Sequence, residues 1–181
     1  MPTLEWSAQL EQALPAMDDT HREFVALLAQ LEAASDEDLV GLWPTLMEHC
    51  QAHFDMEDRW MLDTGFAADN CHSSQHKVVL DVLTQGVEHV LVGDGERVRS
   101  LLRDLASWFS YHAQTMDAAL AQHLRAVGYD PQEGGALHPE ALPPVSVTDC
   151  GGACSNGRDQ VIYAQVQQQM KEAAKSATPS V

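Results

Sequence analysis

Apolar residues recur at steps of three and four from residue 17 to residue 124, with almost none of the alternation typical of β-strands. The first helix that this spacing predicts runs from about residue 18 to 34, with a stripe of Met17, His21, Phe24, Leu28 and Leu31. A histidine in such a stripe needs a partner, because burying an unsatisfied polar group is costly. Taken alone, His21 fits a hydrogen-bonded core residue better than a metal ligand.

The second predicted helix runs from a start near Ser35 to Gly65. Ser35 and Asp38 form a capping-box-like pair, and Gly65 is a typical C-terminal cap. Pro44 should kink this helix or mark its true start. The inner face of the helix mixes apolar and polar side chains: Leu42, Leu46, Cys50, His53, Glu57 and Met61.

Two more helices follow after short turns. Asp69 or Asn70 caps the third, which ends at Gly93, and the fourth extends from Asp94 or its neighbour to Gly128. The stripe of the third helix contains His72, His76, Val79, Leu83, Val87 and Val90. The stripe of the fourth contains Leu101, Leu105, Trp108, His112, Met116, Leu120 and Leu124. Short connections make neighbouring helices antiparallel, so the prediction is an all-α, up-down-up-down four-helix bundle with an N-terminal arm.

Composition changes after residue 130. Residues 131–181 hold five of the eight prolines and five of the eleven glycines, which predicts a mostly irregular linker and tail behind a domain of residues 1–130. Residues 160–176 carry a thin apolar stripe, which predicts either a short helix or a helix that forms only on docking to a protein partner. The tail pair Cys150 and Cys154 matches no strong zinc or redox spacing.

Charge excludes several classes of partner. The chain has 27 acidic and 10 basic side chains, a formal net charge of -17, and residues 1–130 carry 22 of the acids against 7 bases. Neither nucleic acid nor an anionic membrane is therefore expected as a partner. The chain has no apolar run of the roughly 18 residues that membrane insertion needs, and its N-terminus lacks the pattern of a secretory signal. The expectation is a cytoplasmic protein with reduced thiols.

Histidines and carboxylates recur on all four helices. His53 with Glu57, and His72 with His76, are spaced i, i+4, so each pair shares a helix face. His112 and Asp117 are five apart, a step that rotates about 140° around an α-helix. Asp117 therefore reaches the interior only by leaning across the helix, and the alternative is a solvated acid.

The inward candidates are five histidines and two carboxylates, too many for one six-coordinate ion. Two adjacent metals would use them all if both carboxylates bridge and the histidines divide three and two, with one position vacant. Imidazole and carboxylate suit iron or another first-row metal better than calcium or magnesium, and the lack of inward cysteine pairs argues against structural zinc.

Four runs of sequence resemble the motifs of the hemerythrin family, over residues 6 to about 129 with Trp6 in the N-terminal arm. They are Met17-Asp18-Asp19-Thr20-His21, the stretch His53 to Met61 (HFDMEDRWM), His72-x-x-x-His76, and Trp108-Phe109-Ser110-Tyr111-His112-x-x-x-x-Asp117. The resemblance implies a single-domain hemerythrin with a C-terminal extension. It also implies a bundle holding two iron ions (Fe2+/Fe3+) joined by an oxo or hydroxo bridge, which binds O2 reversibly.

Carried over by position, the resemblance assigns a role to each candidate ligand. His72, His76 and His112 would hold one iron, and His21 and His53 the other, with Glu57 and Asp117 bridging both. O2 would bind at the vacant position of the second iron, where nitric oxide or small anions are alternatives. The function implied is oxygen storage, delivery or sensing without catalysis. The rival is a di-iron enzyme or sensor handling peroxide, nitric oxide or iron.

The O2 pocket expected from the resemblance is lined by Phe24, Met61, Trp108, Phe109 and Ala113. Ala113 departs from the bulky aliphatic residue usual in the family, and Phe109 stands where an aliphatic residue is more common. We expect Ala113 to open the pocket and speed autoxidation. Asp58 replaces a common second glutamate and is interpreted as a minor surface change.

The other histidines and cysteines receive structural interpretations. His49, one turn before His53, is expected behind the ligands or at the surface. We expect three further histidines to be exposed: His89, His123 and His138. Cys50 and Cys71 are expected to be small buried or half-buried residues.

Overall fold

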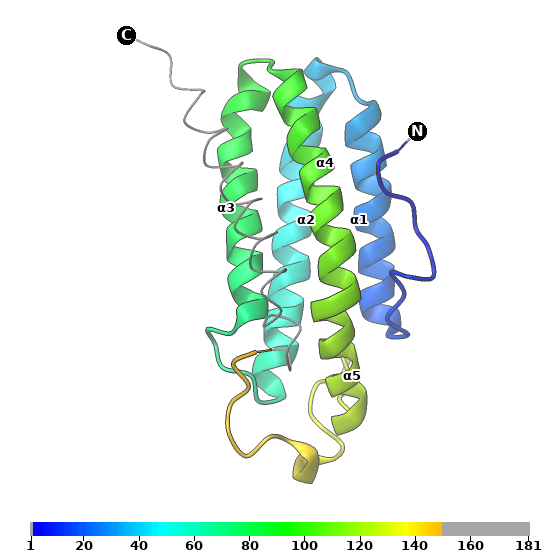
Figure 1. Cartoon of the computed structure of the whole chain (residues 1–181), viewed down its shortest axis with the longest axis vertical. Helices are drawn as coiled ribbons and strands as arrows, with labels where there is room; N and C mark the ends of the chain where they lie inside the picture. The colour runs from blue at the N-terminus through cyan, green and yellow to red at the C-terminus, as the bar shows by residue number, and fades with distance from the viewer. Residues whose placement is uncertain (1, 150–181) are drawn as a thin grey trace.

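The structure is a computed structural model that describes residues 2–149. This part of the chain is an all-α, up-down-up-down four-helix bundle, as predicted (Figure 1). Its main helices are α1 (Pro15–Ala33), α2 (Asp36–Asp63), α3 (Cys71–Leu91) and α4 (Gly95–His112). A π-helix, η1 (Ala113–Asp117), continues α4 into α5 (Ala118–Val127). Within the described residues, no helix is long and apolar enough to cross a membrane.

Local side chains explain where the helices begin and end. The Ser35 hydroxyl accepts a hydrogen bond from the Asp38 N–H at the start of α2. Asn70 and Ser73 form a reciprocal capping box at the start of α3. Gly128 takes the left-handed conformation, with φ 62°, and ends α5. These caps fix where α2 and α3 begin and where α5 ends.

The second predicted helix begins where expected, and the fourth differs from the structure. Helix α2 begins at Asp36, after its cap Ser35, and continues through Pro44, so the alternative that Pro44 marks its start is wrong. The single helix expected from Asp94 to Gly128 is divided by η1, because five residues there form a wider π turn.

The apolar core consists of two clusters with a polar layer between them. The larger cluster includes Phe24, Phe54 and Phe109, and the smaller one includes Met17, Met61 and Leu120. Along α1 the order is Met17, His21, Phe24, so the histidine lies between the two clusters. Along α2 the corresponding order, from the larger cluster to the smaller, is Phe54, Glu57, Met61.

Helices α2 and α3 approach closely at a glycine. Trp43 of α2 is 2% exposed and donates its indole N–H to the Leu83 carbonyl of α3 at 3.0 Å. A Cβ atom on Gly86 would lie 2.4 Å from Cζ2 of Trp43. The lack of a side chain at Gly86 therefore makes room for the indole ring.

The described part of the C-terminal segment returns to the bundle. Residues Pro139–Ala141 form a short 3-10 helix, η2, and Val147 pairs with Phe66 in an isolated bridge. The Cys71 N–H donates to the Thr148 carbonyl at 3.1 Å, beside the start of α3. The division into residues 1–130 and 131–181 stays a prediction. The possible helix at residues 160–176 and the pair Cys150 and Cys154 lie outside the described residues.

The cysteines correct one expectation. Cys50 is buried and free, whereas Cys71 is half-buried and disulfide-bonded, so the expectation of reduced thiols is wrong for Cys71. The reason is that the chain passes Cys71 again near residue 148, a contact that sequence spacing does not reveal. Burial raises the pKa of the Cys50 thiol to about 12.

Candidate metal centre

Seven side chains from the four helices and η1 meet in the layer between the two apolar clusters. Each is at most 3% exposed: His21, His53, Glu57, His72, His76, His112 and Asp117. These are the seven metal-ligand candidates found in the sequence. The periodicity placed the histidines and Glu57 on inner helix faces, and the structure brings those faces together.

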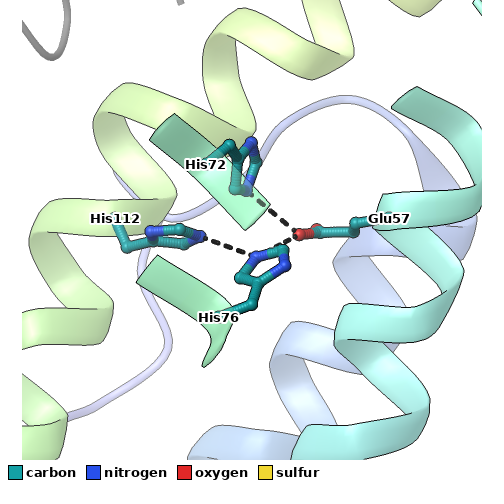
Figure 2. Close-up of side chains that lie close together, drawn as sticks. All are labelled: Glu57, His72, His76 and His112. Atoms are coloured by element: carbon teal, nitrogen blue, oxygen red, sulfur yellow. Dashed lines mark hydrogen bonds and ion pairs between the residues drawn. The ribbon is translucent and has the colours of Figure 1, made fainter. Parts of the chain in front are cut away.

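The donor atoms form two groups that share one carboxylate. Glu57, His72, His76 and His112 form the first, and His21, His53 and Glu57 form the second, with the donor atoms of each group within 4.8 Å of one another. Figure 2 shows His72 and His76 of α3 directed at Glu57, with His112 of α4 directed at His76. We call these the three-histidine side and the two-histidine side.

Each carboxylate faces both sides. Glu57 Oε2 lies 3.3 Å from Nε2 of both His72 and His76, while its Oε1 lies 3.0 Å from Nε2 of His53. Asp117 Oδ1 lies 3.1 Å from Nε2 of His72, while its Oδ2 lies 3.3 Å from Nε2 of His21. One oxygen of each carboxylate is therefore available on either side of the centre.

The π-helix η1 explains how Asp117 reaches the interior. In an α-helix, five residues would turn Asp117 about 140° away from His112. The wider π turn between them reduces this rotation, and Asp117 Oδ1 lies 3.1 Å from Nε2 of His112. The interpretation of Asp117 as a solvated acid is therefore wrong, because its side chain is 0% exposed.

Two residues outside the predicted ligand set orient the histidine rings. Asp58 Oδ1 lies 2.9 Å from Nδ1 of His76, and Gln75 Oε1 lies 3.1 Å from Nδ1 of His112. Trp108 also donates its indole N–H to Gln75 Oε1, which identifies that atom as an acceptor. Asp58 is therefore more than the minor surface change expected from the sequence.

These contacts favour the ring tautomer that a metal ligand needs. Nδ1 of His76 and of His112 each face an acceptor, and the tautomer that donates from Nδ1 leaves the lone pair of Nε2 free to bind a metal ion. The two Nε2 atoms nevertheless lie 3.3 Å apart. Two lone pairs facing each other at this distance repel, unless a cation lies between them. This pairing fits a metal ion.

Other buried polar atoms support the same fit. Among the described residues, Nε2 of His21, Oε2 of Glu57 and both carboxylate oxygens of Asp117 have no hydrogen-bond partner. The contacts of 3.1–3.3 Å at these atoms lack hydrogen-bonding geometry, although the atoms are close enough to share an ion. Buried polar atoms are normally satisfied, so these atoms suit a bound cation as their partner.

The electrostatics of the centre keep the acids ionised. Burial and the neighbouring carboxylate oppose ionisation of Glu57, but His53 and His72 outweigh them and hold its pKa well below the ordinary value. Burial likewise opposes ionisation of Asp117, but His112, His21 and His72 hold its pKa well below the ordinary value. The centre therefore contains two buried negative charges, which a cation bound there would balance.

The histidines respond differently to the same surroundings. Burial lowers the pKa of His112 to about 4, against the opposing effect of Asp117, so this ring is neutral at pH 7. Burial also lowers the pKa of His21, but Asp117 and Glu57 reverse this and raise it overall, with a further contribution from the Leu10 carbonyl. A neutral ring is the form that binds metal.

The residues expected around an O2 pocket are divided between the two sides. The Phe109 ring meets the His21 ring edge-on, with 5.0 Å between the ring centroids. The centroid of the Phe24 ring lies 4.5 Å from that of Phe109. Ala113 is fully buried and belongs to the same apolar cluster. Trp108 instead stacks on His112 at 4.4 Å, on the three-histidine side. Met61 packs in the smaller cluster.

The remaining histidines correct part of the sequence interpretation. His49 is half-buried beside Phe24 and joins neither donor group. His89 is 7% exposed, with Nδ1 3.6 Å from Asp94, so its expected exposure is wrong. His123 is half-buried and donates from Nε2 to the Thr64 carbonyl at 2.9 Å, because α5 packs against the end of α2. His138 is exposed, as expected.

The sequence of this chain is similar to those of known proteins. The family described as the hemerythrin HHE cation binding domain matches residues 12–124. A bacteriohemerythrin from Ralstonia nicotianae is 31% identical over 136 residues, which cover 75% of this chain and 99% of that protein. No solved structure gives a significant match. The chain belongs to the hemerythrin family.

Proposed function

We propose that this protein binds O2 reversibly at two iron ions held between its four helices, and that it stores, delivers or senses oxygen rather than turning over a substrate. The observation that carries the proposal is the pair of facing Nε2 atoms on His76 and His112, beside two carboxylates that each face both sides. Membership of the hemerythrin family supports iron as the metal and O2 as the ligand.

The donor set favours iron. Five imidazoles and two carboxylates are nitrogen and oxygen donors, which suit first-row transition metals better than calcium or magnesium. Oxygen-activating di-iron bundles use mostly carboxylates, with Glu-x-x-His motifs. The histidine-rich set of this protein therefore favours a carrier over an oxygen-activating enzyme.

The two sides differ in their number of donors. The three-histidine side offers three nitrogens and one oxygen from each carboxylate, whereas the two-histidine side offers only two nitrogens with the same oxygens. The two-histidine side therefore has room for an external ligand. O2 is the ligand we propose there, and nitric oxide or a small anion would compete for the same place.

The chain's own residues define the surroundings of that ligand. Ferrous iron supplies the electrons for reversible O2 binding when it is bound. Phe109 lies against His21 and Phe24 lies against Phe109, and these rings exclude water from this side, which slows irreversible oxidation. Glu57 and Asp117 stay ionised and balance the charge of the cations.

The test is anaerobic loading of the full chain with ferrous iron, followed by O2 and then by degassing. We expect about two irons per chain, as in other histidine- and carboxylate-lined di-iron bundles. A visible absorption band should appear with O2 and disappear on degassing. Immediate irreversible oxidation, or turnover of peroxide, would contradict the proposal and favour an enzyme.

Matched variants separate the site from the fold. His72→Ala should lose bound iron, whereas His138→Ala, an exposed histidine outside the donor groups, should bind iron like the parent. Equal iron content in the two variants would contradict the site. Circular dichroism of both metal-free variants checks that the bundle is intact.

A further inference from the structure

The π-helix η1 receives a hydrogen bond from outside the helix. Its first carbonyl, on Ala113, accepts from the Ala118 N–H in the five-residue pattern of a π turn. The same carbonyl accepts a second bond of 2.7 Å from Nε2 of Gln12, a buried residue 101 positions earlier in the chain. A side chain of the N-terminal arm, residues 2–14, therefore contacts the turn that carries Asp117.

Gln12 is itself held by two other elements. Gln12 is 7% exposed, and its backbone N–H donates to Asp18 Oδ1 of α1 at 2.7 Å. Its backbone carbonyl accepts from Nη1 of Arg125 in α5. These two bonds hold the backbone of Gln12 to α1 and α5, within reach of η1.

The same amide lies near a second candidate ligand. Nε2 of Gln12 is 3.2 Å from the Leu10 carbonyl, and that carbonyl also faces His21. His21 and Asp117 also approach each other, with Nε2 of His21 and Oδ2 of Asp117 3.3 Å apart. Gln12 therefore lies between the backbone beside His21 and the turn beside Asp117.

The bond from Gln12 favours the π turn over an α turn. Widening the helix at Ala113 turns its carbonyl toward the arm, where the amide of Gln12 meets it. In the competing α turn, that carbonyl would accept from the Asp117 N–H, and Asp117 would point about 140° away from His112. Loss of the external donor therefore weakens the conformation that directs Asp117 inward.

We propose that Gln12 is a positioning residue for the metal centre, whose side-chain amide stabilises the π turn and so directs Asp117 toward His21 and His112. The proposal rests on the proposed metal-binding function for its consequence, but not for the local contact. The two can therefore be tested separately.

The first experiment uses the metal-free full chain. Gln12→Leu removes the donor, and Gln9→Leu is the control, because Gln9 is exposed in the same arm. Amide hydrogen exchange of Ala118 should accelerate about tenfold in Gln12→Leu, because the bond from its N–H to the Ala113 carbonyl breaks each time the weakened π turn opens, with little change in Gln9→Leu. Exchange at Ala118 equal to that of the parent would overturn the proposal.

The second experiment measures Co(II) binding through its visible spectrum. Gln12→Leu should weaken binding about 10–100-fold, as is usual when a residue that orients a ligand is lost. Combined with Asp117→Asn, it should add no further loss, because both changes remove the same ligand. Additive losses in the double variant would overturn the proposal.

A second substitution covers a folding failure. Gln12→Glu keeps the shape of the side chain but replaces the donor with an acceptor, so it should reproduce both effects of Gln12→Leu. Normal exchange and normal Co(II) binding in Gln12→Glu would overturn the proposal. If the parent itself binds no metal, the proposed function fails, and the exchange of Ala118 still decides the role of Gln12.

Discussion

Gln75 and His112 are joined by a hydrogen bond of 3.1 Å between Oε1 of the amide and Nδ1 of the ring. The two residues lie on different helices, α3 and α4, and the Trp108 indole donates to the same oxygen. The contact holds the lone pair of His112 Nε2 toward the interior. Gln75 thus orients the ring of His112, although Gln75 is not itself one of the candidate ligands.

Replacing Gln75 should weaken metal binding without unfolding the bundle. Gln75→Leu removes the acceptor, so we expect about 10–100-fold weaker Co(II) binding in competition with a chelator. Gln75→Glu keeps an acceptor and should retain binding. Gln85→Leu, an exposed position on the same helix, is the control. Equal affinity in Gln75→Leu and Gln85→Leu would show that the contact does not matter.

The metal-free protein should become less stable as the pH falls from about 6.5 to 4. The pKa of His112 is lowered to about 4 in the folded state, so the unfolded chain binds more protons across this window. The loss is of the order of 3 kcal/mol, at about 1.4 kcal/mol for each pKa unit. Urea unfolding with a chelator at several pH values measures it.

The control for this pH dependence is His112→Gln, which removes the titrating ring. Its stability should vary less between pH 6.5 and 4.5 than that of the parent. The depressed pKa values of Glu57 and Asp117 act at lower pH, since they stabilise the fold above their unfolded values and lose this effect as the pH falls further. The raised pKa of His21 acts in the opposite range, and its contribution is lost as the pH rises above 6.5. An unchanged slope in His112→Gln would rule out His112 as the source.

Two glycines should respond in opposite ways to alanine. Gly86→Ala would place Cβ 2.4 Å from Trp43 and should cost about 1–3 kcal/mol of unfolding free energy through overpacking. Gly41→Ala has nothing within 4 Å and should stabilise its helix by about 0.5–1 kcal/mol. Denaturant unfolding of both variants tests this. Similar signs for the two would refute the close approach of α2 and α3.

Ala13 should be improved by glycine. Its φ of 53° lies in the left-handed region, which costs a residue with a Cβ atom about 1–2 kcal/mol. Ala13→Gly should therefore raise the unfolding free energy by about 1 kcal/mol, despite the greater freedom of the unfolded chain. Ala26→Gly, at an exposed position within α1, should lower it by a similar amount. Thermal melting compares the two, and a loss of stability in Ala13→Gly would contradict the expected strain.

Ala113 should influence how long an oxygenated sample survives. The side chain is 0% exposed and lies in the cluster that contains Phe24 and Phe109. Ala113→Ile should fill space beside the two-histidine side and slow autoxidation relative to the parent. The decay of the O2-dependent absorption band measures the rate. Equal or faster decay in Ala113→Ile would reject a role for this position in the pocket.

Much of the fold was predictable because each helix carries its own signals. Ser35, Asn70 and Gly128 act through neighbours within a few residues, and the structure confirms these caps. The inward faces were predictable for the same reason, since His53 with Glu57 and the two histidines of α3 each repeat after one turn. Caps and one-turn repeats depend only on nearby residues, so they do not change when the helices pack together.

Contacts between residues far apart in the chain could not be predicted from the sequence. Asp58 reaches His76 across 18 positions and Gln75 reaches His112 across 37, so no local spacing reveals either one. The direction of Asp117 depends on a π turn, which the five-residue step alone did not predict. Cys71 depends on the return of the chain near residue 148.

The polar layer between the two apolar clusters has a consequence for how the protein melts. Apolar contacts hold each half of the bundle together, but the layer between them contains buried carboxylates and facing lone pairs. Without a cation, this layer couples the halves weakly, so each half can open on its own. A metal ion joins ligands from all four helices, and binding it would make unfolding more cooperative. The metal would then stabilise the bundle as well as bind the ligand.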